Sequence, residues 1–239
     1  MKKLGIIGGL GPMATARFLA LITAMTAAEK DQDHIEILLH SRPAIPDRTA
    51  FILGKSSDSP LPDLCAVAAG LAKAGAEILA IPCFTAHLFY RQICEAARIP
   101  VIDAIGETVA HLQSAAINRV GILATDGTLH SRLFQDRLAE ADISAICPDD
   151  DIQRLVMDII YNEVKKGARI SSAKLDAITG HMHDKGAQTI LLGCSELSLL
   201  KDFDAPPTTP PLLDVLTVLA RSAVLHCATL HPEYEDLRM

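Results

Sequence analysis

The 239-residue chain lacks the charge pattern and the apolar length that mark nucleic-acid-binding and membrane proteins. Its formal net charge is −7 with a pI near 5.7, and no Lys and Arg cluster of the kind that phosphate binding requires is present. No uninterrupted apolar run approaches the roughly 20 residues of a membrane helix. Glycine and proline interrupt the N-terminal apolar stretch, which predicts a strand and not a signal peptide. We expect a cytoplasmic protein that binds neither nucleic acid nor membrane.

Cysteine motifs for metals or disulfides are absent as well. Six cysteines are spread along the chain with no C-x-x-C and no Cys/His spacing of a zinc site, so we expect free thiols. Any one of them, taken alone, is more simply a small buried apolar residue. The glycine-rich loop at residues 8–12 has neither a G-x-G-x-x-G spacing nor a P-loop ending, which disfavours a nucleotide.

What the sequence does contain is alternating strand and helix patterns, with 49% hydrophobic residues to form a core. Predicted strands cover 4–8, 35–39, 77–82, 99–102, 120–125, 143–147 and 188–192. Predicted helices cover 14–28, 85–98, 128–140, 151–166, 171–185 and 213–229. This alternation indicates an α/β fold with mainly parallel, doubly wound sheets covered by helices on both faces.

An internal repeat divides the chain into two similar halves. The segment from Gly75 to Cys83, GAEILAIPC, resembles the segment from Gly186 to Cys194, GAQTILLGC, with the same glycine-to-cysteine spacing. We predict two α/β domains related by a pseudo-twofold axis, with the active site in the cleft between them. The predicted domains are residues 1–103 plus 207–239, which include a returning C-terminal helix, and residues 104–206. A proline-rich linker at 205–211 precedes that helix.

The repeat places Cys83 and Cys194 just beyond the carboxyl ends of strands, where open α/β sheets hold their ligands. A helix N-terminus is expected to lower a thiol pKa below its free value of about 8.5. A thiolate is then a base and a neutral thiol an acid, so a facing pair can invert a carbon. Glu196 is expected to cap the helix start, while a catalytic and a structural role for His87 have equal support.

Several further motifs carry a resemblance that spans nearly the whole chain in order. They are GGLGPMAT at the start, IPDRT (45–49), IPCFTAH (81–87), ATDGT (124–128), VKKG (164–167) and GCSEL (193–197). Together they resemble the aspartate/glutamate racemase family. The resemblance implies a cofactor-independent, usually dimeric amino-acid racemase of two similar α/β domains, with one cysteine on each side of the substrate's α-carbon.

The same resemblance assigns roles to individual residues. Cys83 and Cys194 match the acid/base cysteines, and Arg48 and Lys165 match positions that contact substrate carboxylates. The other matched substrate-binding positions are Leu10, Thr85, Thr125 and Ser195. Phe84 stands where the family usually has an asparagine that holds polar groups of the substrate, so it either changes side-chain preference or closes an apolar subsite.

The leading hypothesis is a racemase of an aspartate- or glutamate-type amino acid, with a small anionic substrate as the ligand and a homodimer as the assembly. Two alternatives stay open. One is a decarboxylase or isomerase of a small dicarboxylate on the same scaffold. The other is a small-anion binding protein without catalysis, in which Phe84 fills the site.

Overall fold

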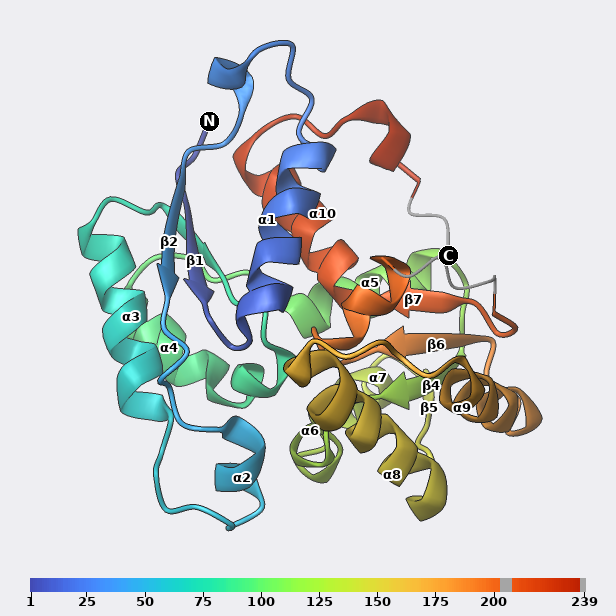
Figure 1. The fold of residues 1–239 in the computed structure, drawn as a ribbon. Helices are drawn as coiled ribbons and strands as arrows, with labels where there is room; N and C mark the ends of the chain where they lie inside the picture. The colour runs from blue at the N-terminus through green and yellow to red at the C-terminus, as the bar shows by residue number, and fades with distance from the viewer. Residues whose placement is uncertain (203–207, 237–239) are drawn as a thin grey trace.

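The computed structural model describes residues 1–202 and 208–236, and it has an α/β fold with two parallel sheets. The first sheet has the order β2-β1-β3, with β1 (Leu4–Gly8), β2 (Ile37–Ser41) and β3 (Ile78–Ala80). The second has the order β5-β4-β6-β7, with β4 (Arg119–Leu123), β5 (Ser144–Ile146), β6 (Thr189–Leu192) and β7 (Leu212–Asp214). All paired strands run parallel (Figure 1). The predicted fold class is confirmed.

Helices cover both sheets and also lie between them (Figure 1). The α-helices are α1 (Pro12–Met25), α2 (Arg48–Ile52), α3 (Leu61–Lys73), α4 (Tyr90–Ala97), α5 (Ala104–Ser114), α6 (Asp126–His130), α7 (Leu133–Ala139), α8 (Asp150–Asp158), α9 (Ser172–Asp184) and α10 (Val215–Cys227). Among the described residues, none of the helices combines the length and the apolar character that crossing a bilayer requires.

The largest hydrophobic cluster joins the two sheets through α1, α5 and α10. It contains Leu4 and Phe18 of the first half, Val120 and Phe134 of the second, and Leu219 of α10, all fully buried. Two further clusters lie on the other face of each sheet, one beneath α3 and α4 and one beneath α8 and α9. The shared cluster holds the two sheets in one fixed arrangement, because close-packed interiors tolerate little relative movement.

The repeated segments have the same local structure. Gly75 and Gly186 follow α3 and α9 with φ angles of 101° and 79°, a left-handed conformation that favours glycine. The next residue in each half donates its N–H to a carbonyl five positions earlier, Ala76 to Leu71 and Ala187 to Met182. Each chain then enters the strand that leads to a cysteine. The repeat in the sequence is therefore a repeat of helix cap and strand.

One predicted strand is reduced to an isolated bridge. Residues 99–102 pair with β3 only at Leu79 and Val101. The Leu79 N–H donates to the Pro100 carbonyl at 2.9 Å, and the Ile102 N–H donates to the Leu79 carbonyl at 2.8 Å. Pro100 has no N–H of its own, so the ladder cannot continue.

Four predicted helices are divided, altered or shortened. The segment 85–98 begins as a 3-10 helix (Phe84–Phe89) before α4, and 128–140 is divided into α6 and α7 by Arg132 at a φ angle of 57°. The segment 151–166 is α8 followed by a π-helix (Ile159–Glu163) and a 3-10 turn (Val164–Lys166). The last helix starts only at Val215, because the Asp214 side chain accepts the Leu216 N–H and caps it, and β7 precedes it.

The predicted division into 1–103 plus 207–239 and 104–206 stays a prediction. Its boundary at 206/207 and the first part of the proline-rich linker, residues 205–207, lie outside the described residues. In the described part of the last segment, β7 pairs with β6, whereas α10 packs against α1 and α5. The C-terminal segment therefore contacts both halves.

A close approach between α2 and α6 joins the halves beside the ends of the strands. A Cβ atom added at Gly127 of α6 would lie 2.8 Å from the Thr49 Cα and 3.0 Å from its Oγ1. Thr49 in turn donates a hydrogen bond to Thr125 at 3.0 Å. Glycine is thus required at this contact because a side chain would collide with Thr49, and not because of its backbone conformation.

We predict that Gly127→Ala lowers the free energy of unfolding by about 1–3 kcal/mol, because the added methyl group overpacks a backbone contact. Gly180→Ala is the matched control, since Gly180 lies inside α9 with no atom within 4 Å of the added Cβ. The control should gain up to about 1 kcal/mol from helix propensity. Urea unfolding followed by circular dichroism measures both, and equal effects would contradict the predicted α2–α6 contact.

Candidate active site

All nine sequence-predicted site residues line one cavity of about 290 Å³, including its open mouth. The lining comes from both halves of the chain and comprises Leu10, Asp47, Arg48, Thr49, Cys83, Phe84, Thr85, Thr125, Tyr161, Lys165, Cys194, Ser195 and Glu196. The two thiols are free and each is 5% exposed. A small ligand in this cavity would therefore have a cysteine from each half beside it.

The backbone places the two cysteines in the same way. Cys83 follows β3 and Cys194 follows β6, and in each case the carbonyl of the cysteine accepts the N–H of the residue three positions later. These N–H groups belong to Ala86 at 3.1 Å and Leu197 at 2.9 Å. Both thiols thus stand just beyond the carboxyl end of a parallel strand, Cys83 as the N-cap of a 3-10 helix (Phe84–Phe89) and Cys194 at the turn that leads into another (Leu197–Asp202).

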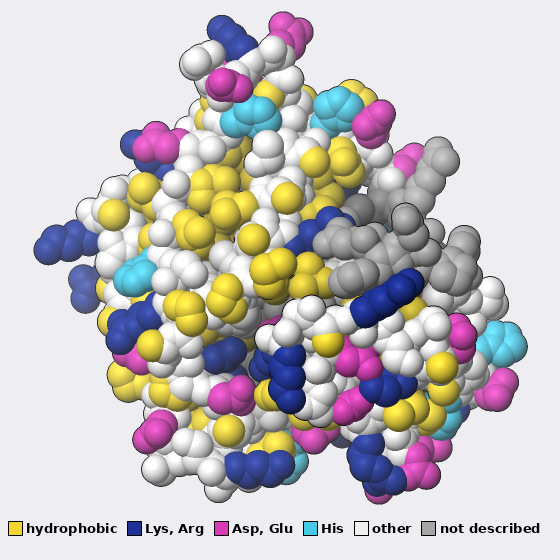
Figure 2. All heavy atoms as spheres, in the orientation of Figure 1, with side chains coloured by type: hydrophobic (Ala, Val, Ile, Leu, Met, Phe, Trp, Pro, Cys, Tyr) yellow, Lys and Arg dark blue, Asp and Glu magenta, His cyan; other side chains and the backbone are white. Residues whose placement is uncertain are grey.

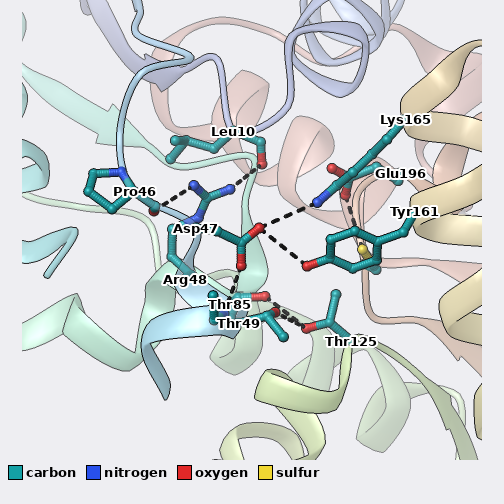
Figure 3. A network of polar contacts seen from close by, with 12 residues as sticks. Leu10, Pro46, Asp47, Arg48, Thr49, Thr85, Thr125, Tyr161, Lys165 and Glu196 are labelled. Carbon is teal, nitrogen blue, oxygen red and sulfur yellow. Dashed lines mark hydrogen bonds and ion pairs between the residues drawn. The ribbon is translucent and has the colours of Figure 1, made fainter. Parts of the chain in front are cut away.

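Arg48 is the charged neighbour of Cys83. The two side chains line the same cavity, and Cys83 is the first of the neighbouring groups that act electrostatically on the guanidinium. Backbone carbonyls hold it in place: Nη1 donates to Ile45 at 3.2 Å and Pro46 at 3.0 Å, and Nη2 lies 3.5 Å from the Leu10 carbonyl (Figure 3). Burial alone would lower the Arg48 pKa, but the charges of Cys83 and Asp47 outweigh burial and raise it. The cation beside this sulfur is therefore permanent.

Cys194 has the opposite neighbour, a carboxylate. Its Sγ donates to Glu196 Oε2 at 3.0 Å. Burial first, and then the charge and hydrogen bond of Glu196, raise the Cys194 pKa well above its usual value, although Lys165 acts in the other direction. The prediction that a helix start lowers this thiol pKa is wrong. Cys194 is separated from the 3-10 helix by a turn, and the N–H groups there do not outweigh burial and an adjacent negative charge.

Glu196 was expected to cap the helix start, but its described side-chain bonds are different. Oε2 accepts from Cys194 and lies 3.4 Å from Ser195 Oγ, which donates to it. The Glu196 side chain is 7% exposed. Sequence spacing could not separate the two roles, because a carboxylate two residues after a thiol can turn toward backbone or toward sulfur.

Lys165 belongs to a second group of contacts, together with Asp47 and Tyr161. Its Nζ lies 3.8 Å from Asp47 Oδ2 and 3.8 Å from the centre of the Tyr161 ring, a cation–π contact. The Tyr161 hydroxyl donates to Asp47 Oδ2 at 3.3 Å (Figure 3). Burial would lower the Lys165 pKa, but Glu196, Tyr161 and further negative charges raise it, so Lys165 remains a cation.

The Asp47 carboxylate is also held by backbone. Its Oδ1 accepts the Ala50 N–H at 2.8 Å as the N-cap of α2. Burial would raise the Asp47 pKa, yet this hydrogen bond and the charges of Lys165 and Arg48 lower it. Asp47 is therefore a fixed anion that joins the first half to the π-helix carrying Tyr161.

Threonine hydroxyls form the remaining polar wall. Thr85 Oγ1 lies 2.8 Å from Thr128 Oγ1, and Thr125 Oγ1 lies 3.1 Å from Thr128 Oγ1 and accepts from Thr49 at 3.0 Å. All four side chains are buried. Hydroxyls both donate and accept, so this cluster can rearrange to bind a carboxylate or an ammonium group.

Phe84 and His87 are largely turned to the protein interior. Phe84 borders the cavity, but it is 1% exposed and its ring packs edge-on against Phe134 of α7 at 6.4 Å. His87 Nδ1 lies 3.2 Å from the Cys83 carbonyl, and Nε2 accepts the Ala104 N–H at 3.4 Å. Burial lowers the His87 pKa, so the ring is neutral and donates through Nδ1. The structural role of His87 is the one that these contacts favour.

Sequence reasoning did not select Asp47, Thr49 and Tyr161. Asp47 and Thr49 flank Arg48 within the IPDRT motif, so the motif itself was the available signal. Tyr161 had no comparable signal, because a π-turn aims it and Asp47 is 114 positions away. In the described ranges, 1–202 and 208–236, no group of three His, Cys, Asp or Glu side chains is arranged to hold a metal ion.

The fold has two parallel sheets, and a cysteine at a strand end of each lines one shared cavity beside two cations. These features define a class of α/β proteins with two similar halves and paired thiols. The family model described as Asp/Glu/Hydantoin racemase matches residues 7–223. The chain belongs to this family, which supports an amino-acid racemase. The family resemblance of the sequence motifs is thus confirmed.

Individual relatives agree with the family. The structure is similar to Picrophilus torridus aspartate racemase, with a TM-score of 0.83, 27% identity and 98% coverage of both chains. The broad specificity amino-acid racemase RacX of Bacillus subtilis is 24% identical over 92% of this chain and 96% of its own length. Glutamate racemase of Francisella tularensis, solved with D-glutamate, shares the fold with a TM-score of 0.68 at 19% identity, covering 94% of this chain and 81% of its own.

We predict that Glu196→Gln makes Cys194 react several-fold faster with iodoacetamide at pH 8, because removing the carboxylate lowers the raised thiol pKa and increases the thiolate fraction. The pH midpoint of the reaction should move downward. Peptide mass spectrometry measures the rate at each cysteine. Cys65, on α3, serves as the internal reference, and a slower Cys194 reaction would contradict the assigned role of Glu196.

Proposed function

We propose that this protein is a cofactor-independent racemase of an aspartate- or glutamate-type amino acid, with Cys83 and Cys194 as the two proton-transferring groups. The observation that carries the proposal is the unequal setting of two thiols in one cavity. Cys83 has a guanidinium beside it, and Cys194 donates a hydrogen bond to a carboxylate. Environments that differ in this way separate an acid from a base among identical side chains.

In the proposed reaction Cys83 acts first as the base and Cys194 as the acid. The Cys83 sulfur takes the proton from the α-carbon of one enantiomer, so the Cα–H bond breaks and an S–H bond forms. The electron pair is delocalised into the α-carboxylate. The Cys194 S–H bond then breaks and its proton reaches the opposite face of the α-carbon, which inverts the configuration. The other enantiomer is converted by the reverse sequence.

The cations and hydroxyls around the cavity support an acidic substrate. Arg48 comes from the first half and Lys165 from the second, so each can bind one carboxylate of a dicarboxylic amino acid. Stabilising the α-carboxylate also stabilises the carbanion, because negative charge develops there as the proton leaves. Thr85, Thr125 and Ser195 supply further hydrogen bonds.

Phe84 contributes to substrate choice through shape in this proposal. Its buried ring offers no polar group where the family usually has an asparagine amide, so recognition of the substrate's polar groups falls to the neighbouring hydroxyls. The side-chain preference is therefore tested with a broad panel of amino acids that includes aspartate and glutamate.

The protein is further proposed to act as a homodimer, in keeping with the family. Apolar side chains gather on the face over α1 and β2 (Figure 2), where Met13 is 64% and Leu39 40% exposed. Exposed apolar patches of this kind mark interaction surfaces. Sedimentation velocity of the purified chain measures the assembly directly.

We predict that Cys83→Ser and Cys194→Ser each lower the rate of racemisation by about 10²–10⁴-fold, because each removes a general acid or base. Each variant should impair α-proton removal from one enantiomer more than from the other. NMR in D2O, with each enantiomer of aspartate and glutamate and a wider amino-acid panel, follows the loss of the α-proton signal.

Cys65→Ser is the control for these variants, since Cys65 lies on α3 outside the cavity lining and is partly exposed. It should keep wild-type exchange. Equal and minor losses in both cavity variants would show that the cysteines are structural. If the folded wild type exchanged no α-proton from any amino acid tested, the proposed function would be wrong.

A further inference from the structure

A second, larger cavity of about 880 Å³, including its opening to solvent, adjoins the inner one. Its lining includes the start of α1, the loop around Pro43 and Ile45, and Val164. Four charged residues line both cavities: Asp47, Arg48, Lys165 and Glu196. These four side chains therefore form the wall between the space that holds the thiols and the wider space outside it.

Glu196 spans this wall. Its Oε2 accepts from Cys194 at 3.0 Å on the side of the inner cavity. Its Oε1 faces Gly11, because a Cβ atom added to that glycine would lie 3.3 Å away. Gly11 lines only the outer of the two cavities. The two oxygens of one carboxylate are thus directed to different spaces.

The other three members of the wall are unsuited to carrying a proton. Arg48 and Lys165 are held as cations, and Asp47 is fixed by the Ala50 N–H, Tyr161 and Lys165. Among the described residues, Glu196 is also the only carboxylate hydrogen-bonded to a cavity thiol. A carboxyl group in such a position can take a proton on the oxygen that faces the outer cavity and, after rotating, donate it on the side of the thiol.

We infer that Glu196 exchanges the proton of Cys194 with water of the outer cavity while substrate is bound, whereas a proton on Cys83, which has no such carboxylate, stays on the sulfur until the product has left and then passes to water that enters the inner cavity. The inference rests on the proposed two-cysteine racemase. After Cys194 has given its proton to the α-carbon, water protonates Glu196 at Oε1. The protonated carboxyl group then rotates about its Cγ–Cδ bond, the O–H proton passes to the Cys194 thiolate, and Glu196 is again a carboxylate. When Cys194 instead takes a proton from substrate, the same steps run in reverse and release it to water.

The two enantiomers then differ in how much solvent deuterium enters the unreacted substrate, although both are racemised. An enantiomer deprotonated by Cys194 loses its proton to the solvent while still bound, so in D2O it regains deuterium whenever the intermediate returns. An enantiomer deprotonated by Cys83 receives its own proton back. Deuterium in the unreacted substrate therefore reports exchange at the sulfur, separately from inversion.

The experiment incubates each enantiomer of aspartate and glutamate with the wild type in D2O and stops the reaction early. Chiral separation with mass spectrometry measures deuterium in the remaining substrate. We expect several-fold more deuterium in the enantiomer whose proton removal is more impaired by Cys194→Ser. In Glu196→Gln this excess should disappear, and Glu196→Asp, which keeps a carboxyl group, should restore part of it.

Asp47→Asn is the matched control, because Asp47 lines both cavities but is bonded to Tyr161 and Lys165 instead of a cysteine. It should change the rate and keep the several-fold difference. Equal deuterium in both enantiomers of the wild type, or an unchanged difference in Glu196→Gln, overturns the inference and leaves racemisation intact. Absence of all α-hydrogen exchange in the wild type defeats the proposed function and this inference together.

Discussion

Compensation of buried charge is the constraint on which the site depends. The cavity places two cations, two carboxylates and two thiols in a space with little access to water, where an unpaired charge is costly. Each charge is accordingly matched: Lys165 by Asp47, and Arg48 by Cys83 and backbone carbonyls. Glu196 is neutralised in part by the hydrogen bond from Cys194. The different properties of the two sulfurs follow from this matching.

The fold supplies the rigidity that such matching needs. The cysteines stand at strand ends in two different sheets, and the large cluster around α1, α5 and α10 holds those sheets together. Phe84 belongs to that cluster and packs across the junction against Phe134, next to the first cysteine. Packing and polar contacts are therefore not separable here, because a shift of one half would move a cation away from its sulfur.

The strand and helix pattern was predictable where periodicity and local signals were strong, as in β1, β6 and α9. The prediction failed where a single residue changed the backbone. Pro100 limited a predicted strand to one bridge, and the left-handed Arg132 divided a predicted helix. The π-turn at 159–163 could not be predicted, because a widened turn has no distinct hydrophobic period. That turn directs Tyr161 into the site, so the local failure had a functional consequence.

The sequence by itself determined the repeat, the position of both cysteines at strand ends, and the family motifs that contain Arg48 and Lys165. These features are local, and a nine-residue pattern of cap, strand and thiol is enough to produce them. Only the tertiary structure decided which charge lies beside which sulfur. Glu196 turns toward Cys194, and Arg48 reaches Cys83 from 35 positions earlier in the chain. Thiol acidity depends on burial and on charges brought near by folding, and neither is encoded in sequence spacing.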